Sequence, residues 1–268
     1  MKKLLVGMMS AAMLVMMVGC GGGEKKAEAP KKAEPAKKVV IGLDDNFAPM
    51  GFRDKDNKIV GLDIDLAREA CKRANLTPEF KPIDWGAKEA EIKSKRIDLI
   101  WNCFTVNPER EKVYGLSKPY LNNAQMIVVR KGDKIEKPAD LKGKIVGVQD
   151  DATGDYILTK RDKALGDSLK KLNKYPDFPA AYLDLDNKRI DCIIVDAVLA
   201  YDTNKKNPGK YDVMKNPIAD EVVAVAFRKD DKELIAKIDK ALDEMKKDGT
   251  AKKICEQWLG ADMIKYEK

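Results

Sequence analysis

The sequence contains no histidine, and its few cysteines are widely spaced. Cys20 lies near the N-terminus, and the others, Cys71, Cys103, Cys192 and Cys255, form no Cys-x-x-Cys pair. These absences argue against a structural zinc site, which is built from closely spaced cysteine and histidine ligands. We expect free, buried thiols, because a chain of this length can build an adequate core without disulfides, although one or two would be allowed outside the cytoplasm.

A hydrophobic run long enough to cross a membrane is also missing near the N-terminus. Residues 4–18 are uncharged and mostly apolar, but the run is only about fifteen residues long, whereas a spanning helix needs ~20. It follows Lys2 and Lys3, and this combination is typical of a signal peptide. We therefore expect residues 1–19 to be a signal peptide outside the fold.

Excess positive charge is concentrated at the N-terminal end of the chain. The formal net charge is +7, of which Lys2 and Lys3 supply two. Residues 21–38 contain only Gly, Glu, Lys, Ala and Pro, and their six lysines exceed their three glutamates by three, which leaves +2 for the rest. Such a segment has nothing to bury, so residues 20–37 are expected to form a disordered tether. The remaining charges are interspersed, which argues against a nucleic-acid-binding surface.

From Lys38 onward, short apolar segments alternate with amphipathic ones, and this order is typical of an α/β fold. The pattern predicts strands over residues 39–43, 97–101, 124–130, 144–149, 192–195 and 221–227, helices over 61–75 and 231–247, and a last helix through Ile254, Trp258 and Leu259. The folded length of about 230 residues fits one large domain or two lobes, and periodicity alone does not choose between them.

Four short strings of residues, in a fixed order, carry a resemblance to a known family. They are Ile41-Gly42-Leu43-Asp44 with Val60-Gly61-Leu62-Asp63; Thr105 to Arg110 with Ser117-Lys118-Pro119-Tyr120; Asp140 to Gly143 with Val146 to Gln149; and Arg189-Ile190-Asp191 with Asp196, then Asp248-Gly249-Thr250. Over residues 38–262 the chain resembles the extracellular, periplasmic-type solute-binding proteins of polar amino-acid ABC transporters (family 3). Met17-Val18-Gly19-Cys20 resembles a lipobox, which implies lipidation of Cys20; a plain signal peptide is the alternative.

The resemblance implies a two-lobed α/β fold, the periplasmic-binding-protein type II fold, with two hinge strands. Lobe 1 would comprise residues 38–122 and 223–268, and lobe 2 residues 123–222. The implied protein is a monomer outside the cytoplasm, anchored to the membrane by its lipid. It binds a free amino acid in the cleft, passes it to an ABC permease, and needs no metal, cofactor or catalytic residue.

The resemblance also assigns residues to the carboxylate of the amino acid. Arg110 stands where the family places an arginine, and a guanidinium suits a carboxylate because it offers two parallel donors and stays charged. Thr105 would add its amide and hydroxyl, and Thr153 the N–H at a helix start. Here the chain departs from the family, because Asp151-Ala152-Thr153 replaces the usual Gly-Ser-Thr. Asp151 could instead cap the following helix.

The ammonium group and the side chain of the ligand would be bound by other residues. Asp196, at a strand end, is the expected partner of the ammonium group, aided by the backbone carbonyl of Cys103; its alternative role is a helix cap. The side-chain pocket would include Asp44, Phe47, Asn102 and Trp101. An acid at position 44 favours Lys, Arg, ornithine or Gln, with cystine as a competitor.

Two other functions are open at this stage. Periplasmic dehydratases that act on cyclic amino acids share the fold, but without histidine their acid–base chemistry would depend on Asp, Glu or Lys. A ligand-sensing ectodomain would be expected to continue into a transmembrane helix and a signalling domain. The intact strings around Arg110 and Asp196 favour binding over both.

Overall fold

The computed structural model describes residues 36–266. The predicted signal peptide, the predicted lipidation at Cys20 and nearly all of the predicted tether therefore lie outside the described residues. A mixed sheet runs through the described part in the order β10-β9-β11-β8-β13-β6-β1-β5, with β12 beside β8 and β7 beside β13. Its strands are β1 (Lys37–Leu43), β5 (Leu76–Pro82), β6 (Leu99–Thr105), β7 (Tyr114–Leu116), β8 (Leu121–Arg130), β9 (Ile145–Gln149), β10 (Lys171–Tyr175), β11 (Cys192–Asp196), β12 (Tyr211–Val213) and β13 (Ala219–Arg228).

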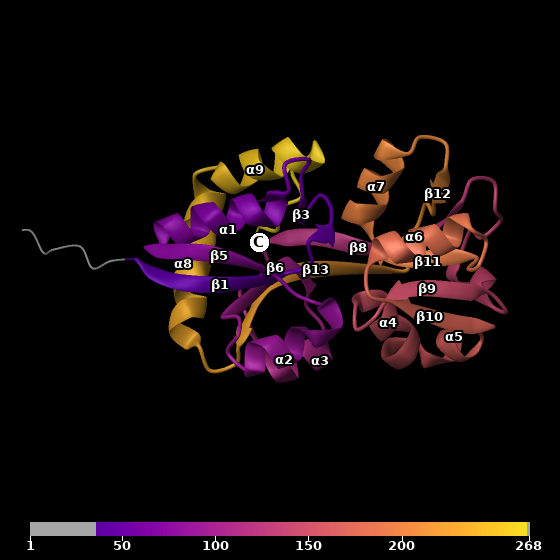
Figure 1. Ribbon diagram of the computed structural model, residues 1–268, viewed down its shortest axis with the longest axis horizontal. Helices are drawn as coiled ribbons and strands as arrows, with labels where there is room; N and C mark the ends of the chain where they lie inside the picture. Colours follow the sequence, from indigo (N-terminus) through magenta and orange to yellow (C-terminus); the bar gives the residue numbers. More distant parts are fainter. Residues whose placement is uncertain (1–35, 267–268) are drawn as a thin grey trace, which may run out of the picture. The chain divides into compact units, whose positions relative to one another are not determined.

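Two long antiparallel strands, β8 and β13, join the two halves of this sheet (Figure 1). They pair with each other between Leu121↔Val223 and Gln125↔Ala219. β13 then continues alongside β6, and β8 continues alongside β11. We call the half around β5, β1 and β6 the first lobe and the half around β9, β10 and β11 the second lobe. The residue limits expected for the lobes stay a prediction.

Helices cover the sheet in both lobes (Figure 1). In the first lobe α1 packs against β5, α8 and α9, and in the second α6 packs against β9 and β11 while α7 packs against β8 and β12. The helices are α1 (Leu62–Arg73), α2 (Lys88–Lys93), α3 (Pro108–Val113), α4 (Thr153–Tyr156), α5 (Lys163–Asp167), α6 (Phe178–Asp186), α7 (Ala197–Lys206), α8 (Lys232–Lys247) and α9 (Thr250–Leu259). Short helical turns are η1 (Trp85–Ala87), η2 (Pro138–Leu141) and η3 (Ile157–Arg161), and a small separate sheet contains β2 (Asn46–Phe47), β3 (Gly51–Arg53) and β4 (Ile59–Val60).

The predicted elements are all present, and one of them is displaced. The strand expected over residues 97–101 is β6, which begins at Leu99 and continues to Thr105. Ile97 instead belongs to the turn after α2, because its amide donates to the carbonyl of Glu91 at 3.4 Å. The strand is longer than expected because its polar end pairs with β13, with Thr105 opposite Val223.

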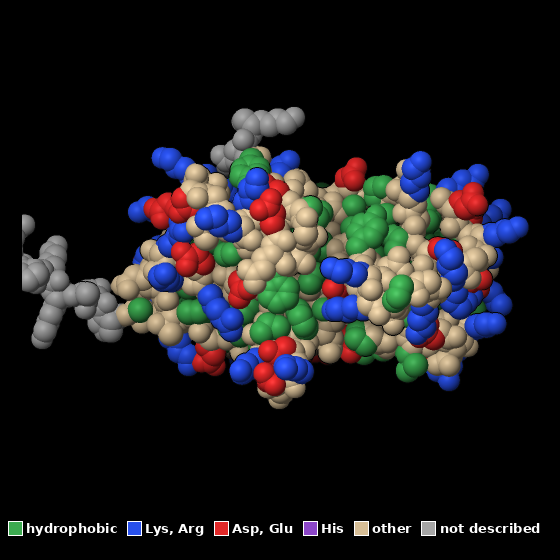
Figure 2. All heavy atoms as spheres, turned by 90° about the horizontal axis from the view of Figure 1, so that it is seen from above, with side chains coloured by type: hydrophobic (Ala, Val, Ile, Leu, Met, Phe, Trp, Pro, Cys, Tyr) green, Lys and Arg blue, Asp and Glu red, His purple; other side chains and the backbone are tan. Residues whose placement is uncertain are grey.

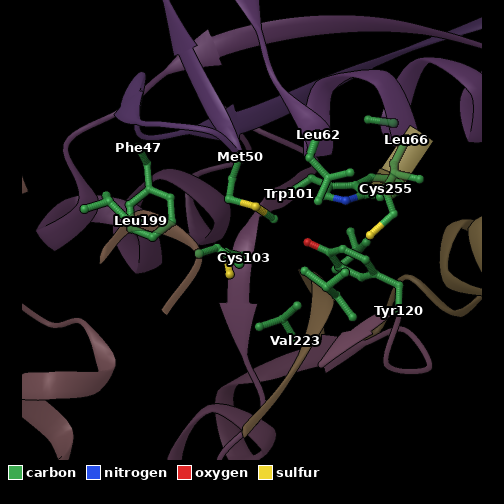
Figure 3. Packing of buried hydrophobic residues seen from close by; sticks show 14 of the residues in the cluster. Phe47, Met50, Leu62, Leu66, Trp101, Cys103, Tyr120, Leu199, Val223 and Cys255 are labelled. Atoms are coloured by element: carbon green, nitrogen blue, oxygen red, sulfur yellow. The ribbon is translucent and has the colours of Figure 1, made fainter. Parts of the chain in front are cut away.

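Buried apolar side chains from both lobes form the core (Figure 3). Four cysteines lie in the described part, at positions 71, 103, 192 and 255, and all are buried and free, which confirms the expected thiols. On the face seen in Figure 2, positive and negative side chains are interspersed. Within residues 36–266, no helix is both long enough and apolar enough to cross a bilayer.

Candidate functional site

A narrow and nearly filled cavity lies between the two lobes. Its lining comes from strand ends and the loops that follow them, and comprises Asp44, Phe47, Trp85, Asn102, Cys103, Thr105, Arg110, Gln149, Ala152, Thr153 and Asp196. Every site residue expected from the sequence except Trp101 is in this set.

Arg110 lies on the first-lobe side of the cavity and is 8% exposed. It occupies the first turn of α3, where its amide donates to the cap residue Asn107 at 2.9 Å. Its guanidinium lies over the ring of Phe104, with 4.3 Å from Cζ to the ring centre, and donates to the carbonyl oxygens of Thr105 (3.0 Å) and Asp151 (3.3 Å). Burial lowers the pKa of Arg110, but a guanidinium remains charged at neutral pH. The site thus holds a fixed, desolvated cation whose described hydrogen bonds go to backbone carbonyls.

Two hydrogen bonds join the lobes across the cavity. The hydroxyl of Thr153, at the start of α4, donates to the hydroxyl of Thr105, at the end of β6, at 2.8 Å. The side-chain amide of Gln149, at the end of β9, donates to Asp44 Oδ2 at 2.7 Å. The lobes are therefore in direct contact at the cavity, as expected for a closed arrangement.

Asp196 lies on the second-lobe side, at the end of β11, and is 6% exposed. It also occupies the cap position of α7, but its carboxylate makes no capping hydrogen bond. That carboxylate faces the first lobe instead, where the thiol sulfur of Cys103 lies 3.9 Å from Oδ1. Burial raises the pKa of Asp196. The structure therefore favours an acceptor role in the cavity over the capping role.

The backbone at Cys103 is held in an unusual conformation beside the cavity. Its φ of 47° lies in the left-handed region, which non-glycine residues rarely adopt. The buried carboxylate of Asp63 fixes it, because Oδ2 accepts the Cys103 amide at 2.7 Å while Oδ1 accepts the hydroxyl of Tyr120 at 2.7 Å. Asp63 of α1 thereby positions the chain at the cavity wall.

The third side of the cavity contains Asp44, Asn102 and Phe47. Asp44 accepts from the amide of Asn46 at 2.9 Å and donates its own amide to Asn102 Oδ1 at 2.6 Å. Burial raises the pKa of Asp44. Phe47 packs on Phe178 of α6, with ring centres 5.8 Å apart. This side thus offers one acidic group next to an aromatic wall.

Trp101 does not line the cavity, so the expectation for this residue is corrected. Its side chain is fully buried in the first-lobe core, where it packs against Tyr120 with ring centres 5.9 Å apart (Figure 3). Neighbouring side chains on a strand point to opposite faces. Because Asn102 faces the cavity, Trp101 faces the core.

Asp151 does not cap the helix that follows it, so the capping role considered for this residue is wrong. Ala152 holds the cap position of α4, and it makes no side-chain bond. The carboxylate of Asp151 instead forms an ion pair with Lys88, the first residue of α2 in the first lobe. The side chain of Lys88 is only 2% exposed. Lys88 also donates to the carbonyls of Asp151 (2.9 Å) and Trp85 (3.1 Å), and burial lowers its pKa to about 8. The departure from the family's glycine therefore supplies a charged contact between the lobes.

This contact leads to a prediction for Asp151→Asn. The variant keeps the size of the side chain, and Asn tolerates the left-handed φ of 54°, but it removes an ion pair between the lobes that separation of the lobes would break. Affinity for the ligand should fall about two- to fivefold, the range expected for a partly exposed pair. Calorimetric titration of the variant, of Lys88→Gln and of the double variant would measure the coupling.

Asp150→Asn is the matched control, because Asp150 pairs with Lys174 of β10 within the second lobe (3.3 Å). If both aspartate variants lowered affinity equally, the contact between Lys88 and Asp151 would have no part in closure.

Three lining residues, Trp85, Gln149 and Ala152, were not expected from the sequence. Gln149 ends the string Val146-Gly147-Val148-Gln149, and a polar residue at the end of a buried strand is a usable signal. Trp85 lies in the turn η1, and its indole nitrogen is buried without a partner among the described residues. Nothing in the local pattern around Trp85 indicated a place in the cavity.

Comparison with known proteins agrees with this geometry. Residues 39–261 match the bacterial extracellular solute-binding proteins, family 3. The L-cystine-binding protein TcyJ of Escherichia coli is 34% identical over 85% of this chain and 84% of its own length, and the arginine-binding extracellular protein ArtP of Bacillus subtilis is 31% identical over 97% of this chain and 98% of its own.

Solved structures show the same architecture. The substrate-binding protein of an ABC uptake transporter from Streptococcus pneumoniae, with bound histidine, superposes with a TM-score of 0.82 at 34% identity, covering 85% of this chain and 95% of that one. The predicted two-lobed α/β fold is thus confirmed. The family match spans nearly all of the described residues, and the chain therefore belongs to family 3 of the bacterial extracellular solute-binding proteins.

Proposed function

We propose that this chain is the substrate-binding component of an amino-acid ABC importer, which captures a free polar or basic L-amino acid between its lobes. One observation carries the proposal: a buried guanidinium, Arg110, and a buried carboxylate, Asp196, face one cavity from opposite lobes. An amino acid carries a carboxylate and an ammonium group, so it can join the two residues and hold the lobes closed. The printed names of the relatives, which bind cystine and arginine, and the bound histidine support this function.

The carboxylate of the ligand is proposed to lie against Arg110. The described hydrogen bonds of the guanidinium go to backbone carbonyls, so a ligand carboxylate would be the first carboxylate to accept hydrogen bonds from it, and such a charge-assisted, bidentate contact is strong. Thr105 would contribute its amide and hydroxyl, and Thr153 its backbone N–H. Both threonines are buried at the cavity wall.

The ammonium group is proposed to lie between Asp196 and the carbonyl of Cys103. The left-handed turn at Cys103 supports this part of the proposal, because a strained backbone conformation held by a buried carboxylate is typical of a functional position. The ligand would thus contact both lobes through its common end, whatever its side chain.

The side chain of the ligand is proposed to extend toward Asp44 and Phe47. Asp44 is the acidic group on this side, so ligands with a donor at the tip are favoured: Lys, Arg, ornithine or Gln, or the second ammonium group of cystine. Two buried donors at the cavity, Trp85 Nε1 and Asn102 Nδ2, have no partner among the described residues. They favour tips that also accept hydrogen bonds, as an amide or the second carboxylate of cystine does.

The remaining parts of the proposal concern how the protein works in the cell. Lobe 1 is proposed to comprise residues 38–122 and 223–268 and lobe 2 residues 123–222, which places the boundaries within the paired region of β8 and β13. Binding would stabilise the closed form, and the permease would recognise that form. The protein is proposed to be a monomer tethered to the membrane by a lipid on Cys20.

A thermal-shift screen of the purified protein against the twenty amino acids, ornithine and cystine tests the function. A ligand at 100 times its dissociation constant adds about 2.7 kcal/mol of stability, which should raise the melting temperature by roughly 5–10 °C at this chain length. We expect a rise with one or a few polar or basic ligands or with cystine. A rise only with Glu or only with leucine-like ligands would contradict the ligand class.

Two further outcomes would contradict the function itself. Refolded protein, freed of any co-purified ligand, that responds to none of these compounds would not be an amino-acid-binding protein. A bound amino acid recovered chemically changed after incubation would identify an enzyme instead.

A further inference from the structure

A second carboxyl group lies beside Asp196, on the long strand β13. The side-chain amide nitrogen of Asn123 donates both to Asp196 Oδ1 (2.7 Å) and to Glu221 Oε1 (2.5 Å). Gln125 Nε2 donates to the same oxygen of Glu221 at 3.0 Å. The two acids come from different strands, β11 and β13, and the bridging amides come from β8, which pairs with both. The pair therefore lies where the lobes are joined.

Around the two carboxyl groups, hydrogen-bond acceptors outnumber donors. Glu221 Oε2, Asn123 Oδ1 and Gln125 Oε1 are all buried without a hydrogen-bond partner among residues 36–266. Leaving buried acceptors unpaired is costly, and two ionised carboxylates in contact repel each other. A proton on Glu221 relieves both problems, because it removes one charge and supplies a donor toward Asp196. Burial, then the charge of Asp196, raises the pKa of Glu221 to about 8.

The other charged and titratable groups around the pair do not replace this proton. Arg110 faces both acids from α3, and its positive charge lowers the pKa of Asp196. The Cys103 thiol faces Asp196 from β6, and burial raises its pKa well above the ordinary value, so it stays protonated. Asp63, whose pKa burial raises to about 7, lies behind Cys103 and is bonded to the Cys103 amide and to a tyrosine. Among residues 36–266, Glu221 is the acid that shares the Asn123 amide with Asp196 and whose pKa is raised to about 8.

We propose that Glu221 is the second carboxyl group of the ammonium site and that it gives up a proton when the ligand's ammonium group arrives. The O–H bond of Glu221 breaks, the proton passes to the solvent, and N–H groups of the ammonium take over as donors to the acids. This inference rests on the proposed function and deepens it, because it makes capture of a cationic α-amino group a proton-linked step.

Because Glu221 loses a proton when the ammonium group binds, the affinity for the ligand depends on pH. An ammonium group beside Glu221 lowers its pKa, so the bound protein holds fewer protons than the free protein between the two pKa values. Within that interval, which ends near pH 8, affinity rises with pH by at most about tenfold per pH unit. Above it Glu221 has already lost its proton in the free protein, and the dependence vanishes.

Calorimetry in phosphate and in Tris, buffers with different ionisation enthalpies, counts the protons released at pH 7. The probe is whichever of L-arginine, L-glutamine and L-cystine binds most tightly. For the unchanged protein we expect release of roughly half to one proton per bound ligand and a rise in affinity of about tenfold or more from pH 6 to pH 8. Glu221→Gln should release almost none and bind with nearly constant affinity over this range.

Glu233→Gln is the matched control, because Glu233 is exposed on α8 and pairs with Lys237 (2.8 Å). It should behave as the unchanged protein. Binding without proton release in the unchanged protein, or equal release by Glu221→Gln, would overturn the inference and leave the proposed function intact. If Glu221→Gln does not fold, the proton count of the unchanged protein decides alone. If none of the three amino acids binds and the screen is negative, the proposed function fails, and the inference with it.

Discussion

Arg110→Ala should lower the affinity for the amino acid at least about thirtyfold. Removing one partner of a buried charge pair costs roughly 2–5 kcal/mol, and each 1.4 kcal/mol is a factor of ten in the dissociation constant. The carboxylate of the ligand would be left in a desolvated cavity without its counter-charge. The carbonyls of Thr105 and Asp151 would also lose their donor, and the second of these contacts joins the lobes. Calorimetric titration measures the effect.

Two companion variants show whether this loss comes from the site. Arg110→Lys keeps the charge but not the fork of parallel donors, so its affinity should lie between those of the unchanged protein and of Arg110→Ala. Arg96→Ala removes an arginine that is 56% exposed and pairs with Glu91 at 2.8 Å, and it should bind normally. Retention of affinity within about threefold by Arg110→Ala would remove Arg110 from the carboxylate site.

The fold was predictable where strands are buried on both faces. β9 and β11 are short apolar runs ended by a polar residue, Gln149 and Asp196, and such runs are typical of strands covered on both sides. The end of β6 was missed because polar residues interrupt its apolar pattern. Asn102 and Thr105 are polar because they serve the cavity, so the apolar pattern stops at Trp101 although the backbone pairing continues.

The candidate site was predictable only in part from the sequence. Arg110, Thr105 and Asp196 stand in strings that resemble the family, and these strings end strands or begin helices that meet at one edge of the fold. The polar contacts between the lobes could not be read in this way. Lys88 meets a residue 63 positions away, and Gln149 meets one 105 positions away. Such pairs depend on how the two lobes pack against each other, which no local pattern encodes.

The environment of Asp196 is a second example. Local sequence marks Asp196 as a strand end, but its partners Asn123 and Glu221 come from the two long strands that join the lobes. Glu221 lies in a run that reads as an ordinary strand. Its special character arises from burial next to another acid, and that is a property of the assembled sheet.

Gly61→Ala should destabilise the protein by about 3 kcal/mol or more. It tests whether the start of α1 holds the cavity wall in place. Gly61 precedes α1 with φ 137° and ψ 173°, a region open almost only to glycine, where other residues pay 1–3 kcal/mol. A Cβ atom there would lie 2.2 Å from the carbonyl oxygen of Met50. That carbonyl cannot move away freely, because it accepts the amide of Asp63 at 2.9 Å. Strain and clash therefore add.

Gly61→Ala should weaken ligand binding as well as lower the melting temperature. The segment that ends at Met50 carries Phe47, so a shift of its backbone displaces the aromatic wall. We expect a fall in melting temperature of roughly 6–12 °C and weaker ligand binding in the fraction that folds. Gly209→Ala is the matched control: its φ is 78° with nothing within 4 Å of the added Cβ, so it has only the backbone penalty of about 1–2 kcal/mol. Equal losses in the two variants would show that the clash with Met50 is relieved at no cost, and that the start of α1 does not hold the cavity wall in place.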